Sequence, residues 1–100
     1  AQSLGAPQKE TVVAYIDLGD FQFTNGLYEQ SIVTYESALV VANPGEQKMT
    51  IYIGIAEAAK AIGKKDIAKQ NYNLAFAEIA KNDETYDAMK ADITERINAL

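Results

Sequence analysis

The chain contains an internal duplication. When its sequence is laid against itself with a shift of 37 residues, Gly26 falls on Gly63. The aligned positions match small residues with small ones and aromatic residues with aromatic ones: Tyr15 with Tyr52, Ile16 with Ile53, Leu18 with Ile55, Gly19 with Ala56, Asp20 with Glu57, Ser31 with Ala68, Tyr35 with Tyr72, and Ala38 with Ala75. Such a period predicts two copies of one supersecondary unit that bury their apolar faces by stacking on each other.

Each copy is predicted to form two helices joined by a glycine turn. Apolar residues recur at three- and four-residue steps before and after Gly26 and Gly63. Glycine ends a helix because it adopts the left-handed conformation without steric cost. The run Asn43-Pro44-Gly45 ends the first copy, since proline cannot continue a helix.

A closing helix is predicted after the second copy. Asn82 or Asp83 can cap its start, and the acids Glu84 and Asp87 in its first turn favour the helix dipole. The predicted fold class is therefore all-α, with about five helices in antiparallel helix-turn-helix repeats. The expected helices span residues 8–24, 28–42, 46–61, 65–81 and 84–99, and residues 1–7 form a flexible lead-in to a single domain at 8–100.

The duplicated pattern resembles the tetratricopeptide repeat (TPR), a 34-residue helix pair with a W-x2-L-G-x2-Y…A-x3-F…A…P pattern. The family's W, L, G, A, F and A places are taken in the first copy by Tyr15, Leu18, Gly19, Ser31, Tyr35 and Ala38, and in the second by Tyr52, Ile55, Ala56, Ala68, Tyr72 and Ala75. The resemblance implies an α-solenoid segment with repeat one at about 12–45, repeat two at about 49–82 and a capping helix at about 84–99. It also implies that Gly19 faces positions such as Ala38 where two helices approach closely. The period of 37 departs from the family's, and the chain has no Trp.

Composition argues against catalysis and against several classes of ligand. The chain has no Cys and no His, which removes thiol nucleophiles, the usual zinc sites and the commonest acid–base group near neutral pH. We therefore expect no catalytic residues, no metal and no cofactor, and we interpret the carboxylates Asp17, Asp20 and Glu57 as solvated or groove-lining acids. The net charge of −5 argues against nucleic-acid binding. The chain has no run of about 18 consecutive apolar residues, so the sequence predicts no membrane-spanning helix.

The lack of Cys is compatible with any cellular compartment. The chain starts at Ala1, as a processed protein or an excised fragment would.

The resemblance implies a concave groove lined by the first helix of each repeat. The implied groove residues are Val13, Ile16, Asp20 and Phe23 in the first copy, Thr50, Ile53, Glu57 and Lys60 in the second, and Asp87 and Thr94 in the closing helix. We expect a non-catalytic protein–protein interaction module or scaffold that binds a peptide there, with apolar residues on the floor and the repeated acids selecting basic side chains. Because exposed charges add little to stability, reversing both acids should leave the melting temperature nearly unchanged.

The alternative function is structural. Two repeats fall short of the three that usually give independent stability. The chain is then an assembly segment of a longer repeat protein, or it forms a homo-oligomer through Phe21, Phe23 and the first helix.

Overall fold

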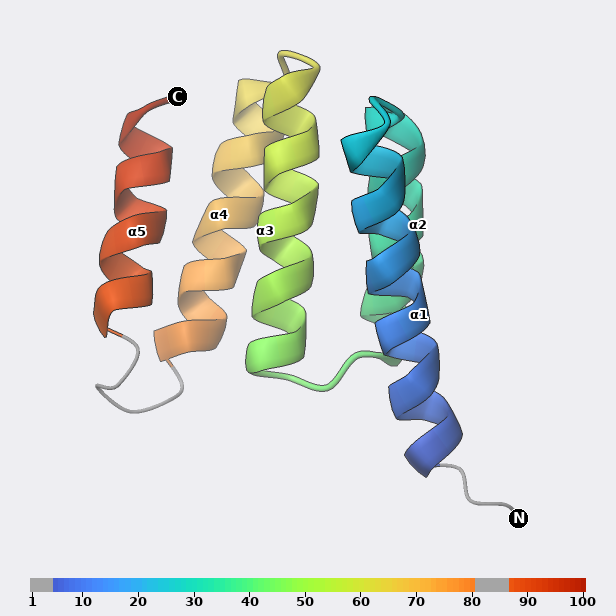
Figure 1. The fold of residues 1–100 in the computed structure, drawn as a ribbon. Helices are drawn as coiled ribbons and strands as arrows, with labels where there is room; N and C mark the ends of the chain where they lie inside the picture. Colours follow the sequence, from blue (N-terminus) through green and yellow to red (C-terminus); the bar gives the residue numbers. More distant parts are fainter. Residues whose placement is uncertain (1–4, 81–86) are drawn as a thin grey trace.

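The described part of the chain is all-helical. A computed structural model describes residues 5–80 and 87–100, and within these ranges it contains five α-helices and no strand. They are α1 (Gly5–Thr24), α2 (Tyr28–Val41), α3 (Glu46–Ala61), α4 (Lys65–Ala80) and α5 (Asp87–Asn98). Figure 1 shows α1 lying beside α2, and α3 beside α4, with α5 at the far end from α1. The predicted all-α class and the five helices are confirmed.

The two glycine turns have the same hydrogen-bond pattern. Gly26 and Gly63 both have a φ of 80°, in the left-handed region. In the first turn, the Leu27 N–H donates to the Gln22 carbonyl at 2.8 Å, and the Gly26 N–H donates to the Phe23 carbonyl at 3.0 Å. The second turn repeats both bonds 37 residues later, with Lys64 N–H to Ala59 at 2.8 Å and Gly63 N–H to Lys60 at 3.1 Å. This is the Schellman arrangement, and its repetition supports the equivalence of the two copies.

Helix ends agree with the predicted ranges to within three residues. Helix α1 begins at Gly5, where residues 1–7 were expected to be a loose lead-in. The expected caps Asn82 and Asp83 and the acid Glu84 lie outside the described residues.

Helix α3 contributes to two clusters of buried residues. The first joins α1, α2 and α3 through Val12, Tyr35, Ala38, Ile51 and Ile55. The second joins α3, α4 and α5 through Met49, Ala56, Ala59, Ala68, Tyr72, Ala75, Ile79 and Ile93. Sequential helices pack against each other, whereas α1 touches α3 much less than it touches α2. The side of α3 toward α1 therefore stays partly open, which places a groove between the first helices.

Candidate functional site

A tyrosine–carboxylate pair occurs at equivalent positions in both copies. In the first copy, the Tyr35 hydroxyl on α2 donates a hydrogen bond to the Asp20 carboxylate on α1. In the second, the Tyr72 hydroxyl on α4 donates to the Glu57 carboxylate on α3. Both tyrosines are buried, and both pairs join residues 15 apart in the chain. The repeated acids thus bind the second helix of their own repeat.

Burial, and then the hydrogen bond to the carboxylate, raises the pKa of both tyrosines. Desolvation is the largest cause that raises the pKa of Tyr35 above its ordinary value of 10.0, followed by the hydrogen bond to Asp20. The pKa of Tyr72 is raised in the same way by desolvation and then by Glu57. Both effects favour the neutral phenol, because an ionised oxygen would be poorly solvated and would face a negative carboxylate.

These shifts predict a loss of stability at alkaline pH. The folded-state pKa of each tyrosine lies above its unfolded value. The contribution of each tyrosine to folding stability is therefore complete below about pH 10 and decreases as the pH rises further. Thermal melts between pH 8 and pH 11 should show a falling melting temperature above about pH 10. The variants Tyr35→Phe and Tyr72→Phe should each flatten this dependence, since phenylalanine does not ionise. An equally steep loss in the double phenylalanine variant would assign the effect to the lysines instead.

Arg96 of the closing helix completes the second pair. Its Nη1 donates to Glu57 and its Nε donates to Asp92 at 2.9 Å. The bond to Asp92, and then the bond to Glu57, raises the pKa of the guanidinium. The Glu57 side chain is 28% exposed and the Arg96 side chain 39% exposed, so the ion pair is partly shielded from water. Arg96 thereby connects α5 to α3.

These contacts revise the expected effect of charge reversal. From the sequence, Asp20 and Glu57 are expected to be exposed acids whose reversal leaves the melting temperature nearly unchanged. Each instead accepts a hydrogen bond from a buried tyrosine, and Glu57 also binds Arg96. A lysine at either position leaves a tyrosine hydroxyl without its acceptor, which costs about 1–3 kcal/mol. Only Asp20 keeps the exposure that was expected of both acids.

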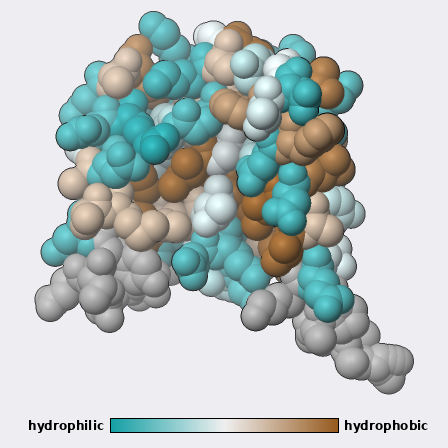
Figure 2. Space-filling view, viewed as in Figure 1, coloured by the Kyte–Doolittle hydropathy of each residue, from teal (hydrophilic) through white to brown (hydrophobic). Residues whose placement is uncertain are grey.

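Three of the groove residues named from the sequence line one hollow. Asp20, Phe23 and Glu57 surround a space of about 270 Å³ together with Tyr35, Gly54 and Arg96. Helices α1, α3 and α5 all contribute to this wall, and we call their common side the first-helix face. Figure 2 shows apolar residues exposed between hydrophilic ones in a view that has α1 and α3 in front.

The remaining groove residues lie outside this hollow. Ile16 and Ile53 are half-buried and pack against the two core clusters, so their role is at least partly structural. Val13, Thr50, Lys60, Asp87 and Thr94 are exposed along α1, α3 and α5. The Thr94 hydroxyl donates to the Lys90 carbonyl at 2.9 Å. Phe23 packs edge-on against Tyr28, with ring centroids 5.2 Å apart.

Two glycines make room for the Tyr35 ring. A Cβ added at Gly19 of α1 would lie 2.6 Å from Cε1 of Tyr35, and one added at Gly54 of α3 would lie 2.7 Å from its Cζ. The resemblance to the TPR implied that Gly19 faces positions such as Ala38. Gly19 instead accommodates an aromatic ring, and Gly54 does the same from the opposite copy.

Sequence reasoning missed Gly54 and Arg96 as parts of the site. For each of these two residues, the sequence contains a feature that could have pointed to its role. Glycine inside a helix costs about 1 kcal/mol relative to alanine, so its presence in α3 calls for a packing reason. Arg96 is the only arginine in the chain.

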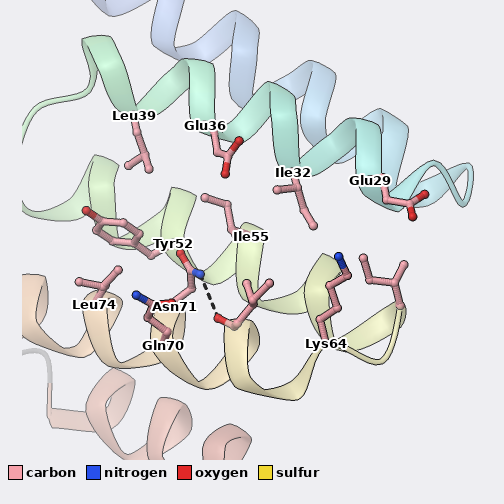
Figure 3. Close-up of a pocket in the computed structure, with 12 residues that line it drawn as sticks. Glu29, Ile32, Glu36, Leu39, Tyr52, Ile55, Lys64, Gln70, Asn71 and Leu74 are labelled. Carbon is pink, nitrogen blue, oxygen red and sulfur yellow. Dashed lines mark hydrogen bonds between the residues drawn. The ribbon is translucent and has the colours of Figure 1, made fainter.

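The opposite side of the molecule carries a larger hollow. It lies between α2 and α4, which we call the second-helix face, and has a volume of about 460 Å³. In Figure 3, Ile32, Glu36 and Leu39 of α2 and Leu74 of α4 border this space, and Tyr52 and Ile55 of α3 lie between the two helices. The Asn71 side-chain amide is hydrogen-bonded to the Ile67 carbonyl at 2.9 Å. The walls of this hollow are largely apolar, and charged side chains lie at its rims.

Within the described residues, no group of three or more acidic, histidine or cysteine side chains is placed to hold a metal ion. In the same residues, every helix is too short or too polar to cross a bilayer. In comparisons with protein families, curated proteins and solved structures, the chain matches none.

Proposed function

We propose that this protein is a non-catalytic interaction module of the TPR type that binds a peptide segment along its first-helix face. The observation that carries the proposal is the hollow between α1 and α3, where Asp20, Phe23 and Glu57 meet. Its volume of about 270 Å³ lies just below the ~300–1,000 Å³ of small-molecule pockets, and it suits individual side chains of a longer ligand. The repeated turns and the repeated tyrosine–carboxylate pairs support the TPR assignment.

The first-helix face is favoured over the larger hollow because charged groups converge on it. Asp20, Glu57 and Arg96 all border one space there, next to aromatic rings. A few polar groups converging on an apolar hollow are typical of recognition sites. On the second-helix face, Glu29 and Glu36 of α2 and Lys64 of the turn before α4 lie at the rims, around apolar walls.

The test is a selection of random peptides on the immobilised chain, followed by calorimetry with single variants. Asp20→Asn keeps an acceptor for Tyr35 and removes the charge, and Phe23→Leu trims the apolar wall. Each should weaken the selected peptides about tenfold or more, or about 1.4 kcal/mol.

Matched controls lie on the second-helix face. Glu36→Gln removes an exposed charge there, and Leu74→Ala trims an exposed apolar side chain. Both should leave peptide affinity unchanged, with helicity checked by circular dichroism for every variant. If these controls abolish binding while Asp20→Asn and Phe23→Leu do not, the first-helix face is the wrong site.

A second candidate, an assembly segment, is favoured by the outer side of α1. Leu18 is 46% exposed and Phe21 is 64% exposed. Their equivalents 37 residues later, Ile55 and Ala58 of α3, are buried in the array. The side of α1 that carries Leu18 and Phe21 therefore lacks the helix that covers the matching side of α3. Sedimentation of the same sample distinguishes the two candidates: a dimer that Phe21→Ser dissociates favours assembly, and a monomer favours peptide binding.

A further inference from the structure

The two repeated acids differ in what they bind besides tyrosine. Glu57 accepts a hydrogen bond from Tyr72 and another from Arg96. Asp20 accepts the equivalent bond from Tyr35, and among the described residues no lysine or arginine is within ion-pair distance of it. One site therefore holds a guanidinium, whereas its equivalent presents an exposed carboxylate.

The register of the helices explains the difference. A shift of 34 residues aligns Ile93 of α5 with Ala59 of α3, and both residues are buried. The same shift places Arg96 on Ile62. Ile62, which follows the end of α3, is uncharged, so this register places no cation at the position that corresponds to Arg96.

The hollow beside Asp20 carries a net negative charge. The charged groups that line it are the acids Asp20 and Glu57 and the base Arg96, which sum to −1. The Asp20 carboxylate has lone pairs left after accepting the Tyr35 hydroxyl. The ring of Phe23 borders the same space, and aromatic faces attract guanidinium groups.

We infer that Asp20 and Tyr35 form a receptor for an arginine side chain of the bound partner, and that Arg96 is the internal occupant of the equivalent site at Glu57. The inference rests on the proposed peptide-binding function and names the side chain that the hollow takes. Arginine is preferred to lysine because its planar guanidinium binds a carboxylate with two donors and stacks on aromatic rings. Arg96 divides its donors between two carboxylates, with Nε on Asp92 and Nη1 on Glu57.

The experiment titrates the isotopically labelled chain with N-acetyl-arginine amide and follows backbone and aromatic NMR shifts. Saturable shifts are expected around Asp20, Phe23 and Tyr35. The citrulline analogue, which has the same shape without the charge, should produce none, and the lysine analogue should bind at least about threefold more weakly. Asp20→Asn should abolish the arginine shifts, whereas the matched control Glu36→Gln on α2 should keep them.

A second variant tests the internal occupant. Arg96→Gln frees the Glu57 carboxylate, so a second set of saturable shifts should arise around Glu57 and Tyr72. Absence of saturable shifts in the unchanged chain, or their persistence in Asp20→Asn, overturns the inference. If selected peptides depend on Asp20 and Phe23 but bind equally well without arginine, peptide binding stands and the arginine receptor does not. If no peptide binds the first-helix face, the proposed function itself fails.

Discussion

Replacing Tyr72 with alanine should lower the free energy of unfolding by about 3–5 kcal/mol, the range for a fully buried aromatic residue. Tyr72 is completely buried and packs in the cluster that joins α3, α4 and α5. Its hydroxyl also donates to Glu57, which holds Arg96 of the closing helix. The loss should be measured by urea unfolding followed with circular dichroism.

Tyr72→Phe is the matched control, because it keeps the ring and removes only the hydroxyl. It should cost about 0.5–3 kcal/mol, the range for one hydrogen bond to a neutral or charged group. Equal losses in both variants would mean that the hydroxyl, rather than the packing of the ring, provides the stability. No loss in either would place Tyr72 outside the core and invalidate the repeat register.

A leucine at Gly54 should destabilise the protein by about 1–3 kcal/mol or more through overpacking. A Cβ alone would lie 2.7 Å from Cζ of Tyr35, and this ring is only 3% exposed and hydrogen-bonded to Asp20, so it has little freedom to move. Gly19→Leu should act in the same way from the other side. In an unobstructed helix the change from glycine would instead be favourable by roughly 1 kcal/mol.

A double-mutant cycle with Tyr35→Leu isolates the clash. The smaller side chain at position 35 should reduce the cost of Gly54→Leu, giving a coupling energy of about 0.5–3 kcal/mol. Additive effects in the cycle would show that Gly54 is needed for a reason other than the Tyr35 ring.

The helices could be predicted from the sequence because their ends carry local signals. Gly26 and Gly63 end the first helix of each copy in the left-handed conformation, and Gly45, with a φ of 94°, precedes α3. Turn chemistry of this kind depends on a few neighbouring residues, so it can be recognised without tertiary information. Helix α1 begins three residues before the expected start at residue 8, and its first turn contains Pro7. Proline is tolerated in a first helical turn, where its missing N–H has no partner to lose.

The candidate site was only partly predictable, because half of it depends on contacts between helices. Asp20, Phe23 and Glu57 followed from the register of the repeat. The role of Arg96 depends on how far the closing helix reaches across α3, and that of Gly54 depends on the ring of Tyr35 from another helix. For the same reason the acids were first interpreted as free charges, since their tyrosine partners lie 15 residues away in the chain.

The position of Tyr35 makes the two copies one cooperative unit. Its side chain belongs to α2, yet it lies against Gly19 of the first copy and Gly54 of the second. Helix α1 therefore cannot detach without exposing a ring that also covers α3. In an array whose stability is a sum of repeat and interface terms, such a shared residue strengthens the interface term and favours a single unfolding transition. A ligand that immobilises Asp20 and Tyr35 at one end of the array consequently stabilises the other end as well, by mass action on the whole folded state.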